Sequence, residues 1–175
     1  MLDDGRLASG SYDNSIRLWN PASGAETARL EGHSDWVTAL AALAGGRLAS
    51  GSADNSIRLW DTASGAETAR LEGHSGRVRA LAALADGRLA SASDDHSVRL
   101  WDLSSGAETA RLEGHSARVR ALAALTDGGL ASGSLDNTIR LWDLSIGAET
   151  ARLEGHSGEV RALVALADGR LASGS

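Results

Sequence analysis

The chain has 175 residues, a length typical of one domain, and 42% of them are apolar, which is enough for a packed core. It contains no cysteine, which excludes disulfides, thiolate metal sites and a cysteine nucleophile. A formal charge of −6 argues against nonspecific binding to nucleic acid or to an anionic membrane, because both need a positive footprint.

Residues 1–32 read as an incomplete repeat. The first predicted strand runs from Arg6 to Ser11, a turn follows around Asp13, and Trp19 lies in the next strand. Asp, Asn and Gly tolerate the backbone of tight hairpins, so their presence between apolar runs indicates turns. The Gly-His pair ending at His33 then opens the first complete repeat.

The repeat that begins at His33 contains four short runs with the composition of strands. They are Val37–Leu43, Arg47–Ser52, Ser56–Trp60 and Glu67–Leu71, separated by turn residues Gly45 and Gly46, Asp54 and Asn55, and Ser64 and Gly65. A helix is the competing interpretation of the run 39–44, because Ala and Leu favour helices. Its shortness and flanking glycines favour a strand. We therefore expect an antiparallel meander of four strands, called a, b, c and d.

The same pattern recurs every 41 residues. Its markers are His33, His74, His115 and His156, and Trp19, Trp60, Trp101 and Trp142. Complete repeats therefore span 33–73, 74–114 and 115–155, and residues 156–175 begin another, with strands expected at Val160–Leu166 and Arg170–Ser175. A four-stranded repeat cannot bury both faces alone, so copies must stack. Radial stacking predicts an all-β propeller, with residues 1–175 forming one propeller domain or half-propeller.

These repeats resemble the WD-repeat (WD40) β-propeller family over essentially the whole chain. The resemblance rests on the Gly-His pair, on a Trp 27 residues after His33, His74 and His115, and on the run SGSADNSIRLWD at residues 50–61. Asn20 departs from the pattern by replacing the Asp that follows Trp, and Gly129 stands where other copies have Arg. The resemblance implies four-stranded blades and peptide or protein binding on the face called top.

The resemblance also implies a structural hydrogen-bonded tetrad in each blade. Carried onto this chain, the sets are His33, Ser50, Asp54, Trp60; His74, Ser91, Asp95, Trp101; His115, Ser132, Asp136, Trp142; and a divided set of His156, Ser9, Asp13 and Trp19. Trp only donates, Ser relays, and neutral His donates from one nitrogen and accepts at the other, so such a network can be buried fully satisfied. A Ser-His-Asp hydrolase triad is the alternative, but repetition of the set favours a structural role.

The divided set suggests how the blades close. His156 has no later Asp or Trp, whereas Asp13 and Trp19 have no earlier His, and residues 2–11 nearly repeat residues 166–175. Closure within one chain would place four blades about 90° apart, and closure between two chains would place eight about 45° apart. Small side chains favour the closer spacing, so we expect a homodimer with an eight-bladed ring and no exposed sheet edges. A segment cut from a longer array is the alternative.

The copies differ mainly after Gly-His-Ser and before the turn Asp. The candidate binding residues there are Asp35, Trp36, Arg77, Arg118 and Tyr12. Trp, Tyr and Arg are enriched at interaction hot spots, although neutral drift at exposed positions would also produce such variation. Arg79, Arg120 and Arg161 lie near the start of strand a, where a ring of arginines could hold an anion or an acidic peptide, or pair with nearby carboxylates.

The sequence therefore predicts a non-enzymatic, self-assembling repeat scaffold with protein or peptide binding on its top face. The alternative is a recently amplified or engineered repeat fragment with no binding activity of its own. We expect no cofactor, no metal and no nucleic-acid or membrane partner; the single turn residue His96 is interpreted as tolerating left-handed geometry rather than as a ligand. The absence of a leader or apolar span predicts a soluble cytoplasmic protein.

Overall fold

The computed structural model describes residues 1–175, and every regular element in it is a β-strand. The strands are β1 (Leu7–Gly10), β2 (Ile16–Trp19), β3 (Glu26–Leu30), β4 (Val37–Leu43), β5 (Arg47–Ser52), β6 (Ile57–Asp61), β7 (Glu67–Leu71), β8 (Val78–Ala83), β9 (Leu89–Ser93), β10 (Val98–Trp101), β11 (Glu108–Leu112), β12 (Val119–Ala124), β13 (Leu130–Ser134), β14 (Ile139–Asp143), β15 (Ala148–Leu153), β16 (Ala162–Ala165) and β17 (Leu171–Gly174). With no helix present, no helical segment could cross a bilayer.

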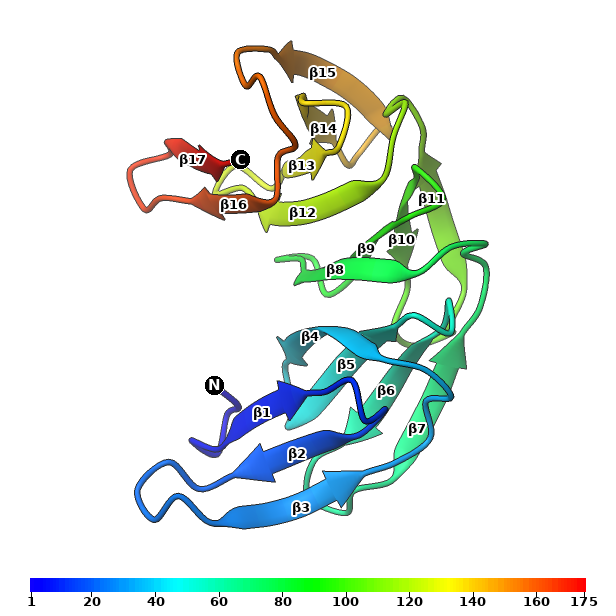
Figure 1. Cartoon of the computed structure of the whole chain (residues 1–175), viewed down its shortest axis with the longest axis vertical. Helices are drawn as coiled ribbons and strands as arrows, with labels where there is room; N and C mark the ends of the chain where they lie inside the picture. The colour runs from blue at the N-terminus through cyan, green and yellow to red at the C-terminus, as the bar shows by residue number, and fades with distance from the viewer. The chain divides into compact units, whose positions relative to one another are not determined.

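Consecutive strands form five sheets, which can be followed in Figure 1. Three sheets have four strands, in the orders β4-β5-β6-β7, β11-β10-β9-β8 and β12-β13-β14-β15. The sheet β1-β2-β3 has three strands and the sheet β16-β17 has two. This confirms the all-β prediction of four-stranded meanders, and each four-stranded sheet is one blade with strands a to d in chain order.

The predicted strand bounds hold closely within the first complete blade. The Ala- and Leu-rich run forms strand β4 rather than a helix, and β5 and β7 have the predicted limits. Strand β6 begins one residue late because Ser56 belongs to the turn, where its amide and hydroxyl donate to Asp54 Oδ1 at 2.9 and 2.7 Å. Strands β1, β16 and β17 are shorter than the predicted runs.

Contacts divide the chain into two compact units, Met1–Leu81 and Ala82–Ser175. The boundary falls within β8, the first strand of its blade. In the first unit β1 packs against β4. In the second unit β12 packs against both β9 and β16.

The b strands form the buried centre of each complete blade. Every residue of β9 and of β13 is buried, although β9 consists only of Leu, Ala and Ser, and β13 only of Leu, Ala, Ser and Gly. Sheets stack closely on these small residues: a Cβ added to Gly51 would lie 2.6 Å from Val78 Cγ1, and Gly133 faces Val160 in the same way. Strand β1 has the same Leu-Ala-Ser-Gly sequence but is largely exposed, so blade context rather than sequence determines its burial.

The turns between strands b and c share one backbone geometry. Asn14, Asn55, His96 and Asn137 occupy it with φ between 67° and 72°. Asn tolerates this left-handed region better than most residues, and His is also enriched there. His96 therefore occupies a turn position that needs positive φ.

Candidate functional site

The four predicted residues of the blade β4–β7 meet in one hydrogen-bonded network. His33 Nδ1 lies 2.8 Å from Asp54 Oδ2, and His33 Nε2 lies 2.7 Å from Ser50 Oγ. Trp60 Nε1 donates to the same Ser50 Oγ at 2.8 Å. Since Trp60 uses this oxygen as an acceptor, the hydroxyl proton of Ser50 is available to His33 Nε2, and the imidazole then donates from Nδ1 to Asp54.

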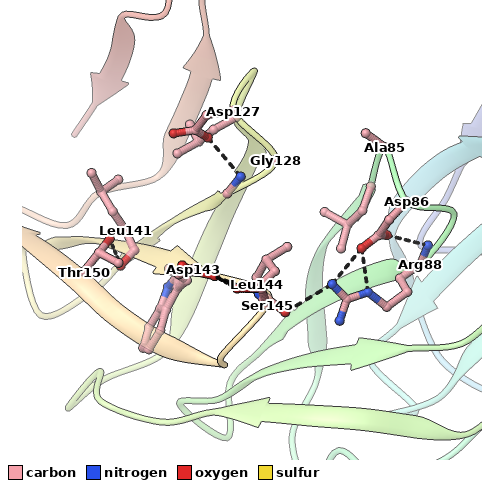
Figure 2. A pocket seen from close by; sticks show the side chains of 14 residues that line it. Ala85, Asp86, Arg88, Asp127, Gly128, Leu141, Asp143, Leu144, Ser145 and Thr150 are labelled. Atoms are coloured by element: carbon pink, nitrogen blue, oxygen red, sulfur yellow. Dashed lines mark hydrogen bonds and ion pairs between the residues drawn. The ribbon is translucent and has the colours of Figure 1, made fainter.

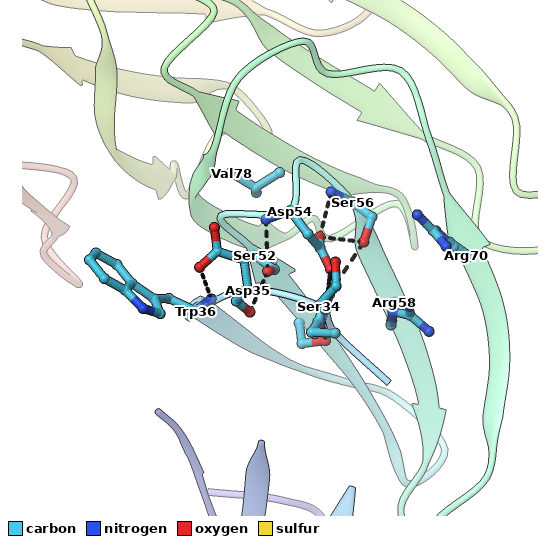
Figure 3. A network of polar contacts seen from close by, with 12 residues as sticks. Ser34, Asp35, Trp36, Ser52, Asp54, Ser56, Arg58, Arg70 and Val78 are labelled. Carbon is cyan, nitrogen blue, oxygen red and sulfur yellow. Dashed lines mark hydrogen bonds and ion pairs between the residues drawn. The ribbon is translucent and has the colours of Figure 1, made fainter. Parts of the chain in front are cut away.

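Electrostatics favour the same protonation states. Burial lowers the pKa of His33 and outweighs the opposite effect of Asp54. Burial acts to raise the pKa of Asp54, but hydrogen bonds from Ser56, His33 and the Ser34 amide lower it below its usual range. Figure 3 shows the Asp54 carboxylate facing Ser34 and Ser56. The pair is thus a neutral imidazole against a charged carboxylate.

Equivalent residues repeat this geometry in the blade β12–β15, and the Trp-Ser and Asp-Ser bonds also recur in β8–β11. In β12–β15, His115 Nδ1 lies 2.8 Å from Asp136 Oδ2, and Ser132 Oγ lies 2.8 Å from both His115 Nε2 and Trp142 Nε1. Hydrogen bonds from Thr138 and His115 overcome the effect of burial and lower the pKa of Asp136 to about 2. In β8–β11, Trp101 Nε1 donates to Ser91 Oγ at 2.8 Å, and Asp95 accepts from the Ser97 amide and hydroxyl, while His74 is buried.

This geometry disfavours a hydrolase. A nucleophilic serine must reach a substrate carbonyl beside an oxyanion hole. Ser50 and Ser132 are completely buried, and each hydroxyl oxygen already bonds to both His and Trp. These serines therefore connect the strands of a blade.

The divided set is held as two separate halves. On the three-stranded sheet, Trp19 Nε1 donates to Ser9 Oγ at 2.8 Å. Asp13 lies in the turn between β1 and β2, where hydrogen bonds from the Ser15 hydroxyl and amide lower the pKa of Asp13 to about 2. On the two-stranded sheet, His156 Nε2 lies 2.7 Å from Ser173 Oγ. Each half therefore has its own serine, bonded to one member of the set, and Ser173 was not among the predicted tetrad residues.

Three of the predicted surface residues form a stacked group in the first compact unit, which we call the aromatic column: Tyr12, Trp36 and Arg77. The Tyr12 and Trp36 rings are 4.3 Å apart and inclined by 18°, and Arg77 Cζ lies 5.3 Å from the Trp36 ring centre. Tyr12 is 70% exposed and Trp36 38% exposed. Figure 3 shows the Trp36 ring extending away from the polar network.

The backbone under the aromatic column is fixed by hydrogen bonds. The Trp36 amide donates to Asp35 Oδ1 at 2.8 Å, and the Trp36 carbonyl accepts from the Ala53 amide at 2.8 Å. Ser52 Oγ donates to the Asp35 carbonyl at 2.9 Å. Asp35 and these bonds thus fix the backbone that carries Trp36, the central residue of the column.

The other predicted arginines differ from one another in exposure and in their bonds. Arg161 bonds to Glu159, with its Nη2 2.6 Å from Oε2, and Arg118 is exposed while its carbonyl accepts from the Leu135 amide. Arg79 and Arg120 are partly buried. At the position equivalent to these strand-a arginines, Thr38 Oγ1 donates to the carbonyls of Gly51 and Val78.

Ion pairs that the sequence patterns did not predict join strands c and d. They comprise Arg17 with Glu26, Arg58 with Glu67, Arg99 with Glu108, and Arg140 with Glu149. In the first complete blade, the Arg58 guanidinium lies against Gly32, where an added Cβ would be 2.8 Å from Nη1. The recurring nine-residue Arg-Glu spacing could have identified these pairs, and they explain why glycine precedes the blade histidine.

A cavity of about 510 Å³ lies in the second compact unit, between the turn at residues 84–88 and the blade β12–β15 (Figure 2). On one side Arg88 pairs with Asp86 and donates to the Leu144 carbonyl at 3.3 Å. On the other side Gly129 replaces the equivalent arginine, and Asp127 accepts a hydrogen bond from the Gly129 amide. The departure at Gly129 therefore changes the lining of this cavity.

A protein-family model matches four successive stretches of the chain. The profile described as "WD40: WD domain, G-beta repeat" matches residues 2–20, 24–61, 65–102 and 106–143. No curated protein sequence matches the chain.

Proposed function

The chain belongs to the WD domain, G-beta repeat family, and from this premise we propose that it is a non-enzymatic interaction scaffold that binds a segment of a partner protein at the aromatic column. Domains of this family generally act in protein interactions. The observation that supports the site is the exposed stack of Tyr12 on Trp36, flanked by Arg77. Rigid, partly exposed aromatic rings supply contact area at low entropic cost, as hot-spot residues do.

The scaffold proposal is tested with peptides selected from a random library on the intact chain and then titrated against variants. Substitutions Trp36→Ala and Tyr12→Ala should each weaken binding by about ten-fold or more, the usual effect of removing a hot-spot ring. Leu135→Ala, at the position equivalent to Tyr12 in another blade, is the matched control and should change the affinity less than two-fold. Selected peptides that bind the two column variants as tightly as the unaltered chain would refute the site.

A second candidate function is self-assembly into a closed, eight-bladed ring of two chains. The half-sets support it, because His156 with Ser173 and Trp19 with Asp13 together contain every member of a tetrad. Strand β1 pairs only with β2, and β17 pairs only with β16, so both sheets have an unpaired edge. Unpaired edges are templates for pairing with another chain, and a closed ring removes them.

Sedimentation equilibrium tests the assembly. The expected mass is twice the 18.0 kDa of one chain, and Trp19→Ala should shift the equilibrium toward single chains. Trp36→Ala, which removes a tryptophan outside the half-sets, should leave the mass unchanged. A mass of one chain at every concentration would contradict the proposal.

A further inference from the structure

A second cavity, of about 290 Å³, lies beside the two-stranded sheet in the second compact unit. Its walls include Ile139 of β14, Leu153 of β15, Leu171 and Ser173 of β17, and His156. Ile139 is buried, whereas Leu153 is 41% exposed. The lining thus combines three aliphatic side chains with the Ser173 hydroxyl, the His156 imidazole, and Glu154 and Gly155, and Ser173 and Glu154 are exposed.

Each of these five wall residues has a counterpart three 41-residue repeats earlier in the chain. These counterparts surround the indole ring of Trp60. They are Ile16, Leu30, Leu48, Ser50 and His33. The first three share a buried cluster with Trp60, and Ser50 Oγ accepts from Trp60 Nε1 at 2.8 Å. His33 meets the Trp60 ring edge-on, with ring centres 6.4 Å apart. The first compact unit therefore shows that this set of side chains holds an indole.

The cavity has the polar group that an indole needs. Ser173 Oγ lies 2.7 Å from His156 Nε2, the same separation as Ser50 from His33. When the hydroxyl donates to the imidazole, its oxygen keeps a lone pair for an indole N–H, as it does for Trp60. Apolar cavities of about 150 Å³ bind benzene, so the present volume leaves room for a bicyclic ring.

We propose that this cavity is a binding site for an indole ring, and that in the assembled protein the ring is that of Trp19 of a second copy. The identity of the ring's source rests on the proposed self-assembly, whereas the chemistry of the cavity does not. Trp19 now donates to Ser9 in a Leu-Ala-Ser-Gly strand, and Ser173 lies in a strand of identical sequence. Replacing β1 by β17 next to β2 exchanges Ser9 for Ser173 as the acceptor without losing a hydrogen bond.

The cavity is tested with 5-fluoroindole, observed by fluorine NMR, on the full chain carrying Trp19→Ala. We expect saturable binding, and N-methyl-5-fluoroindole, which cannot donate, should bind about five- to ten-fold more weakly, as expected for one lost hydrogen bond. Ser173→Ala should cause the same loss, and Ser9→Ala should cause none. Leu153→Phe, which narrows the cavity at an exposed wall, should abolish binding while circular dichroism stays unchanged. Absence of saturation, or equal binding of both probes, would overturn the cavity proposal.

The source of the ring is tested separately with the unaltered chain. If Trp19 of a second copy occupies the cavity, 5-fluoroindole should bind at least ten-fold more weakly than to the Trp19→Ala variant, and the mass should be that of two chains. Probe binding to the variant together with a single-chain mass for the unaltered protein would retain the cavity and reject Trp19 as the occupant. Equal affinity of 5-fluoroindole for the unaltered chain and for the Trp19→Ala variant would also reject Trp19 as the occupant of the cavity.

Discussion

Replacing Ser50 with Ala should destabilise the first compact unit strongly, because one oxygen satisfies two buried groups. Ser50 Oγ accepts from Trp60 Nε1 and bonds to His33 Nε2, at 2.8 and 2.7 Å. Trp60 is 1% exposed and the His33 side chain is fully buried, so water cannot replace the lost partner. Leaving a buried donor or acceptor unpaired costs about 1–3 kcal/mol. With two such groups, we expect about 2–6 kcal/mol of lost unfolding free energy.

Ser9→Ala is the matched control, since Ser9 makes the same bond to Trp19 Nε1 at 2.8 Å. Ser9 is exposed and Trp19 partly exposed, so water can take over that bond, and the loss should stay below about 1 kcal/mol. Urea unfolding followed by tryptophan fluorescence measures both changes. Losses that agree within about 0.5 kcal/mol would refute the claim that burial makes the serine important.

Three further predictions concern local packing, pH and a turn. Gly32→Ala should lower the free energy of unfolding in urea by about 1–3 kcal/mol, because the added Cβ would lie within 3.2 Å of the Arg58 guanidinium and of the Trp60 ring. Gly158→Ala is the control: its Cβ would meet no atom within 4 Å, so the free energy of unfolding should change by less than about 0.5 kcal/mol. Burial lowers the pKa of His33 and His115, so the folded state prefers neutral imidazoles. The urea midpoint should therefore be constant above about pH 6.5 and fall as the pH drops from there to the lowered pKa values, because only the unfolded imidazoles take up a proton in that range. A urea midpoint unchanged between about pH 7.5 and 5 would contradict this. His96 has a φ of 72°, which Asn tolerates and Val does not. His96→Asn should therefore keep or slightly raise the melting temperature, and His96→Val should lower it. The opposite order would show that the turn does not need a positive φ at this position.

Much of the fold follows from local chemistry. Turn residues such as Gly45, Gly46 and Asn55 have positive φ, and they separate runs that are strands in the structure. The run at 39–44 was ambiguous by propensity alone, and its shortness and flanking glycines favoured the strand that is observed. Strand length depends on pairing with neighbouring strands. The end strands β1 and β17 are shorter than β5 and β13, which have the same Leu-Ala-Ser-Gly run inside complete blades.

The candidate sites could be predicted only in part. Residue types identified Tyr12, Trp36 and Arg77, but their stacking is a relation between separate turns that strand periodicity does not encode. The Arg58–Glu67 pair was missed because charged residues on strands read as solvent-facing. The indole-sized cavity depends on side chains from three strands and a loop meeting in space, and only comparison with the surroundings of Trp60 reveals its chemistry.

Hydrogen exchange of the tryptophan indole N–H groups tests the account most directly. If each blade depends on one His, Ser, Asp and Trp set, and the divided set is completed by Trp19, the Trp19 indole should be protected to the same order of magnitude as that of Trp60 at concentrations where two chains associate. The exposed Trp36 indole is the fast-exchanging reference. Exchange of the Trp19 indole at the rate of Trp36, with Trp60 protected, would contradict the account.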